Sequence, residues 1–90
     1  MFRVEIKGLE TVSREMNDLA MATARLDGEI VKLNFDPRNP AAVRQAIHEM
    51  DRAVDSRVGN LIRSASVRKL VQEMKSRYRT KIEDIVRKSR

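Results

Sequence analysis

Few side chains in this 90-residue sequence could take part in chemistry, and those that could are scattered. A nucleophilic site would need a serine or cysteine beside a histidine. The only histidine, His48, is flanked by Ile47 and Glu49 next to an apolar stripe, and the chain has no cysteine. We expect His48 to be an ordinary residue at the edge of a core. The sequence therefore predicts no catalytic residues and a protein that is not an enzyme.

Paired carboxylates offer no better site. Glu49 and Asp51, and also Glu83 and Asp84, fall within helical patterns, where we expect them to pair with arginines at helical spacing. The three glycines are scattered and form no phosphate-binding loop. No set of residues has the spacing of metal ligands. We expect no cofactor, no metal ion and no small-molecule substrate.

Positive charge is concentrated in the second part of the chain. Residues 57–90 carry a net charge of +8, whereas residues 1–56 carry −2. Such asymmetry indicates a polyanionic partner, an acidic protein surface as partner, or simply a solvated helix face. The candidate phosphate contacts are Arg68, Lys69, Lys75, Arg79 and Lys81. Aromatic residues make up only 3% of the chain, so base stacking is disfavoured and any nucleic-acid binding is expected to be non-specific.

Length and composition favour association with another chain. Ninety residues form a single domain, residues 1–90, with a marginal core, and the absence of cysteine removes disulfides as a source of stability. Oligomerisation is the remaining route. No apolar run is long enough to cross a membrane, and the first residues lack a signal-peptide cleavage site. We expect a cytoplasmic protein with no membrane partner.

One apolar pattern dominates the first third of the chain. Its residues alternate in steps of three and four, which is typical of a helix that packs along another helix. They are Leu9, Val12, Met16, Leu19, Leu26, Ile30 and Leu33, with Thr23 as the one polar residue in register. The spacing predicts a helix over residues 10–33, at most kinked at Asp27-Gly28, with a break into two helices as the alternative. We expect this seam to hold a homo-oligomer together.

A short strand is expected before this helix. Residues 2–7, Phe-Arg-Val-Glu-Ile-Lys, alternate between apolar and charged side chains, and Gly8 follows them. No second strand is visible in the sequence. The strand would therefore pair with a second copy, pair with a different protein, or fray.

Two further helices follow a well-marked loop. The loop at residues 34–39 ends in Asn39 and Pro40, which together form a strong helix start. Helices are predicted over residues 40–58 and 64–88, separated by Gly59-Asn60, although the two could be nearly continuous. Phe35 is expected to pin the loop against the helices. The expected fold is mainly α: a short N-terminal β-strand followed by three helices in an oligomerising bundle.

Two segments also carry a family resemblance. Residues 2–10, Phe-Arg-Val-Glu-Ile-Lys-Gly-Leu-Glu, resemble the start of small tail-associated and head–tail joining proteins of tailed bacteriophages. Residues 33–40, Leu-Asn-Phe-Asp-Pro-Arg-Asn-Pro, look like a segment of small prophage-encoded proteins. The chain departs from the joining proteins where those become β-rich. The resemblance implies a phage or prophage structural protein in a bacterial host, with other phage structural proteins as partners and no catalytic residues to carry over.

These observations lead to two functional hypotheses. The first is a non-enzymatic structural or assembly protein that self-associates through its first helix, in the host cytoplasm or in the virion. The second is an accessory protein that binds nucleic acid non-specifically through the basic face of its last helix.

Overall fold

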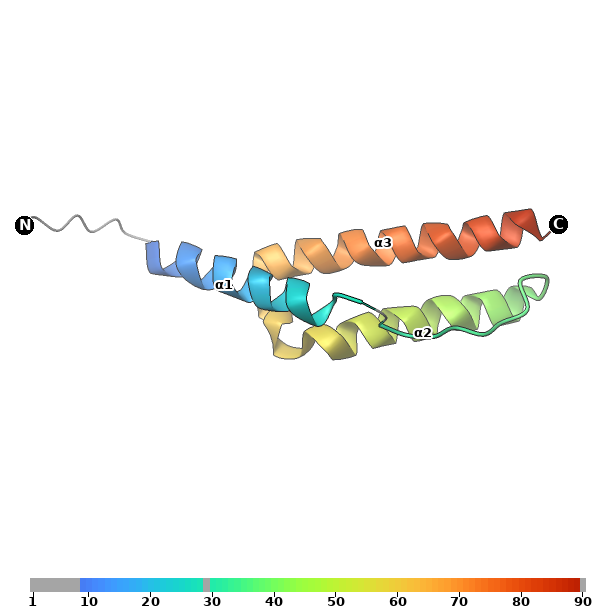
Figure 1. The fold of residues 1–90 in the computed structure, drawn as a ribbon, viewed down its shortest axis with the longest axis horizontal. Helices are drawn as coiled ribbons and strands as arrows, with labels where there is room; N and C mark the ends of the chain where they lie inside the picture. Colours follow the sequence, from blue (N-terminus) through green and yellow to red (C-terminus); the bar gives the residue numbers. More distant parts are fainter. Residues whose placement is uncertain (1–8, 29, 90) are drawn as a thin grey trace, which may run out of the picture.

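The computed structural model describes residues 9–28 and 30–89, and side chains from residue 13 onward. The described chain forms α1 (Leu9–Arg25), α2 (Pro40–Val58), the short 3-10 helix η1 (Gly59–Arg63) and α3 (Ala65–Lys88). The helices α2 and α3 form an antiparallel hairpin joined by η1, and α1 packs at the η1 end (Figure 1). The first turns of α1 reach beyond the hairpin (Figure 1).

The hairpin has local signals at both ends of α2. The Asn39 side chain accepts hydrogen bonds from the backbone N–H groups of Ala41 and Ala42, and Pro40 is the first helical residue. At the other end, Gly59 has φ 57° and ψ −135°, and its N–H donates to the carbonyl of Asp55. This backbone conformation suits glycine alone. The bounds of α2 coincide with the predicted helix over 40–58, and α3 begins one residue after its predicted start.

The first helix is shorter than the sequence predicted. It ends at Arg25, where the Leu26 N–H donates to Ala22 and the Asp27 N–H to Ala24 in a final turn. Gly28 then has φ 78°, a conformation that a helix cannot contain. The predicted helix over residues 10–33 is therefore wrong beyond Arg25. The weak point at Asp27-Gly28 is the place where the helix stops.

Residues 30–36 run as an extended segment, the strap, from the end of α1 along α2 to the far end of the hairpin (Figure 1). Along it, Val31, Leu33 and Phe35 are half-buried, whereas Lys32 and Asn34 between them are exposed. No hydrogen bond joins residues 30–35 to any other described residue. Ile30, Leu33 and Phe35 instead pack their side chains against the core. The strap is therefore held by apolar contacts, and Phe35 pins it as expected.

A turn at the far end carries the chain from the strap into α2. The Asp36 side chain accepts a hydrogen bond from the Arg38 N–H, and the Asp36 carbonyl accepts one from the Asn39 N–H. The Arg38 side chain donates to the carbonyl of Ser89, just after α3, at 3.3 Å. This contact ties the turn to the end of the last helix.

The predicted fold class needs correction. The described part of the chain is helical apart from turns and the strap, and it contains no β-strand. The strand predicted at residues 2–7 lies outside the described residues, so the proposed order of one strand followed by three helices has no support. The mainly α character agrees with the prediction.

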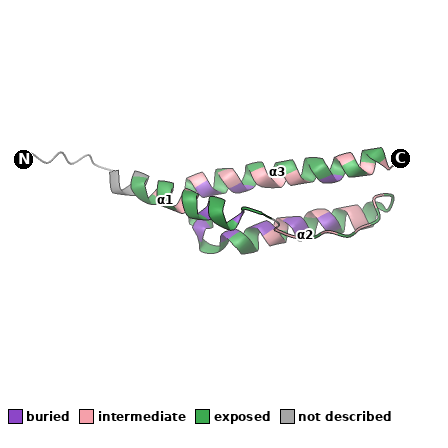
Figure 2. Ribbon diagram, viewed as in Figure 1, coloured by how far each residue is buried: buried purple, intermediate pink, exposed green. Residues whose placement is uncertain are grey.

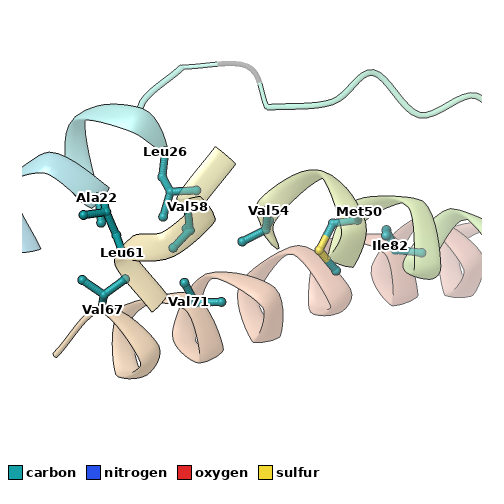
Figure 3. Close-up of a cluster of buried hydrophobic side chains, with 9 residues drawn as sticks. All are labelled: Ala22, Leu26, Met50, Val54, Val58, Leu61, Val67, Val71 and Ile82. Carbon is teal, nitrogen blue, oxygen red and sulfur yellow. The ribbon is translucent and has the colours of Figure 1, made fainter. Parts of the chain in front are cut away.

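The core is a thin line of side chains between the helices (Figure 3), and the buried positions lie mainly where the helices face one another (Figure 2). Met50, Val54, Val58 and Val67 are almost completely buried, and Ala22 and Leu26 cover them from α1 and its final turn. Toward the far end, Ile82 on α3 meets Met50 on α2 (Figure 3), and the strap lies over this part of the hairpin. One end of the molecule thus has three packed helices, and the other has two helices and a strap.

Candidate functional site

The residues of the predicted seam do not share one environment. Leu26 is 4% exposed and packs in the core, whereas Met16 is 67% exposed. Leu19 is half-buried and Thr23 is exposed. The side chains of Leu9 and Val12 lie outside the described residues. The seam is therefore split between the face of α1 that packs on the hairpin and the face that points away from it.

The last two seam residues are covered by the chain itself. Ile30 and Leu33 lie in the strap, where they pack against the core rather than continuing a helix. The uninterrupted helical ridge over Leu9–Leu33 is therefore absent. What is left for a partner is the part of α1 that the hairpin does not cover.

An uncharged face runs along the outer side of α1. Six exposed side chains with helical spacing form this face, which we call the outer face. They are Ser13, Met16, Asn17, Ala20, Thr23 and Ala24. The charged residues of the same stretch, Arg14, Glu15 and Asp18, lie on the other side and line a cavity against η1. In a chain with 36% charged residues, six neighbouring exposed side chains without a charge mark a surface of distinct character.

The Thr23 hydroxyl of the outer face is satisfied within the helix. The Thr23 hydroxyl donates to the carbonyl of Leu19 at 2.8 Å, so its methyl group is left to face outward. The Asn17 amide lies 3.8 Å from the sulfur of Met21. Burial of Thr23 by a partner would therefore leave no hydroxyl group without a hydrogen-bond acceptor, and the usual desolvation cost of burying such a donor would not arise.

Two arginines fix the end of α1 on the hairpin. Arg25 donates from Nη1 to the carbonyl of Val58, the last residue of α2, at 3.1 Å. Arg57 donates from Nη1 back to the carbonyl of Arg25, the last residue of α1, at 3.2 Å. Each guanidinium thus satisfies a C-terminal carbonyl of the other helix and places a positive charge at the negative end of that helix. This reciprocal contact joins the end of α1 to the end of α2 and so helps to set the orientation of the outer face.

Most of the basic residues predicted to contact a polyanion form hydrogen bonds or ion pairs within the protein itself. Lys75 lies 2.8 Å from Asp55 on α2, and Arg79 lies 3.9 Å from Asp51. Arg68 donates to the carbonyls of Ile62 and Arg63, at the end of η1. Only Lys69 and Lys81 of the five predicted residues form no hydrogen bond or ion pair with a described residue, and Lys81 lies over the ring of Tyr78. The structure does not gather these five residues into one open cationic surface.

The remaining candidates for chemistry stay apart. His48 is exposed on α2. Within the described residues, no group of three or more histidine, cysteine, aspartate or glutamate side chains could hold a metal ion. Neither do the described helices include one with the length and apolar character needed to cross a membrane.

The sequence reasoning missed the residues that define this site. Ala20, Ala24, Arg25 and Arg57 were not singled out, because alanine is common in any helix and no neighbouring motif marked the two arginines. The absence of charge at positions 13, 16, 17, 20, 23 and 24 was visible in the sequence as a signal. The pairing of Arg25 with Arg57 needed the three-dimensional arrangement.

The fold and this surface define a small helical protein with one exposed, uncharged helix face. The sequence model of the YuaX family matches residues 6–90, and the chain belongs to that family. No curated protein and no solved structure matches the chain.

Proposed function

We propose that this protein is a non-enzymatic assembly protein that self-associates through the outer face of α1. The observation that carries the proposal is the run of six exposed, uncharged side chains on a helix that projects beyond its own hairpin. The first half of α1 has little of the chain to pack against, and a short helix that is not packed is marginally stable in water. Cover from another molecule would stabilise it.

A second copy of the chain fits this face better than an unrelated partner. A two-fold interface must be complementary to itself. On the outer face a bulky Met16 lies beside the small residues Ala20 and Thr23, so the side chain of one copy has room between the small residues of the other. The net charge of +6 opposes association elsewhere on the surface, but no charge lies on this face.

The setting that we propose is the bacterial cytoplasm or a phage or prophage particle. This part of the proposal depends on the sequence resemblance of residues 2–10 and 33–40, because the matching family's name describes no particle or partner.

Light scattering and sedimentation over a hundredfold range of micromolar concentrations test the self-association. We expect a dimer or higher oligomer for the natural chain. Met16→Glu and Ala20→Arg should shift the mass toward the monomer, because each places a charge on the outer face without disturbing the core. A natural chain that remains monomeric over the whole range would contradict the proposal.

Ile62→Glu is the matched control. Ile62 is an apolar residue of η1, is 37% exposed and lies outside α1. The same substitution there should leave the mass unchanged. Equal effects at Met16 and Ile62 would show that the added negative charge, and not its place on the outer face, governs association. Circular dichroism melting of the monomeric variants checks that they remain folded.

A further inference from the structure

A second surface with chemical character lies at the other end of the molecule, where the strap replaces a helix. A groove of about 360 Å³ runs between the strap and the hairpin. Ile30, Leu33 and Phe35 form its strap side, and Met50, Ile82 and Ile85 form its hairpin side. Met50 and Ile82 are buried, whereas Ile85 is 49% exposed. The groove therefore has an apolar floor and an apolar rim that is open to solvent.

A single cation stands at this groove. Lys81 lines it, and its Nζ lies 5.7 Å from the centre of the Tyr78 ring, which also lines it. Lys81 forms no ion pair with any residue that the structure describes. By contrast, Lys75 and Arg79, which also belong to α3, each form an ion pair with an aspartate of α2. No described carboxylate lines the groove. Among the described residues that line the groove, Lys81 thus carries the one formal charge.

This combination selects a class of ligand. The apolar walls favour a hydrocarbon chain, and the lone ammonium group favours one anionic group at the end of that chain. The volume lies at the lower end of the roughly 300–1,000 Å³ of small-molecule cavities, which suits one medium-length chain. Apart from Tyr78 and Lys81, the described side chains that line the groove are apolar, so a nucleotide base or sugar would find few hydrogen-bonding partners among them.

We propose that the strap groove binds an anionic amphiphile with a single alkyl chain, such as a fatty acid, with Lys81 contacting its carboxylate. The alkyl chain lies between the strap and Ile82, and it covers side chains that are half-exposed in the structure. The strap can adjust to such a ligand because apolar side chains alone hold residues 30–35 in place. The site uses no residue of the α1 outer face, so it is independent of self-association.

Isothermal titration with dodecanoate below its micelle concentration tests the proposal. Dodecyltrimethylammonium, with the same chain and the opposite charge, is the comparison ligand. We expect saturable binding of one dodecanoate per chain and at least tenfold weaker binding of the cation. Equal binding of the two ligands would overturn the proposal, because the chain alone would then account for the affinity.

Matched variants locate the site. Lys81→Gln should weaken dodecanoate binding about tenfold or more, whereas Lys69→Gln, at another exposed and unpaired lysine of α3, should leave it unchanged. Ile85→Glu should abolish binding, whereas Ile62→Glu, at a residue of η1 that is 37% exposed and outside the groove, should not. A loss at Lys69 or Ile62 as large as at Lys81 or Ile85 would overturn the proposal.

Arg44→Gln excludes a neighbouring site. Arg44 lines a larger cavity, about 650 Å³, at the turn where α2 begins. We expect this variant to bind dodecanoate as the natural chain does. A loss at Arg44 with none at Lys81 would place the ligand at that turn and contradict the assignment to the strap groove.

Discussion

The two ends of the α2–α3 hairpin are covered in different ways. At the η1 end, Ala22 and Leu26 lie on Val58, Leu61 and Val67, and all five are buried. At the far end the strap supplies Leu33 and Phe35, which are only half-buried, and the strap groove and the cavity of about 650 Å³ at the turn before α2 lie there. The core is thus closed at the helix-covered end, where mainly polar side chains line the cavity beside η1, whereas the strap-covered end has an apolar groove.

The difference shows what a change from helix to extended chain does to a small core. A helix presents a stripe of side chains and is wide enough to fill the space between two others. An extended segment presents every second side chain and is narrower, so it covers the same length with fewer contacts. In this protein the change at Arg25 therefore separates the end of the hairpin with a helix-covered core from the end with an apolar groove.

The strongest test of this contrast removes the same side chain at both ends. Leu26→Ala should lower the free energy of unfolding by about 2–4 kcal/mol, because it opens a cavity in a closely packed region. Leu33→Ala should cost less than half of that, since Leu33 is half-exposed and its site can collapse. Urea unfolding at one fixed protein concentration measures both. Equal losses would show that the strap contributes as much as the helix.

The glycines provide a second comparison. Gly59→Ala should cost about 1–3 kcal/mol, because the backbone at φ 57° and ψ −135° excludes a β-carbon. Gly28→Ala should cost about 1 kcal/mol, since a β-carbon there would have no neighbour within 4 Å and only the positive φ opposes it. Thermal unfolding gives the order of the two. A more stable Gly28→Ala variant would indicate that the helix continues once the glycine is gone.

A third test removes the arginine contact between α1 and α2 and measures how much it stabilises the helix-covered end. Arg25→Met should cost about 1–2 kcal/mol, because the Val58 carbonyl loses its charged donor at the end of α2. Arg52→Met is the control, since Arg52 is exposed on α2 and forms no hydrogen bond or ion pair with a described residue. If both variants unfold at the same urea concentration, the contact does not secure α1.

The smallest effect is expected for the ion pair between α2 and α3. Lys75→Met should cost less than about 1 kcal/mol, because Asp55 is 56% exposed and water screens the pair. The difference from the natural chain should shrink further as salt is added. A double-mutant cycle with Asp55→Asn isolates the pair. A coupling energy of several kcal/mol would contradict its solvent-exposed character.

Local signals were sufficient for the hairpin. Asn39 followed by Pro40 marks the start of α2 because capping depends only on neighbouring residues, and Gly59 marks its end for the same reason. Phe35 was predicted to pin the loop against the helices, and its half-buried side chain packs against the core.

The end of α1 was missed because two patterns overlap in the same residues. Leu26, Ile30 and Leu33 continue a helical spacing, but Val31, Leu33 and Phe35 also alternate as an extended chain does. The positive φ at Gly28 decides between them, and a helix-breaking cost of about 1 kcal/mol seemed too small to do so. The partners of Lys75 and Arg79 were beyond sequence reasoning, since they depend on how α2 and α3 are aligned in the hairpin.

The strap has one more consequence, because side chains and not backbone hydrogen bonds hold it in place. The backbone of residues 30–35 links α1 to α2 but forms no hydrogen bond with any other described residue. Lys32, between the half-buried Val31 and Leu33, is exposed and therefore accessible to a protease. A cut there would divide the protein into two pieces, of which one carries α1 and the other the hairpin. The two pieces would still be joined by Ala22, Leu26 and the arginine contact. The main effect of the intact peptide bond is therefore to keep the two pieces at a high effective concentration around each other.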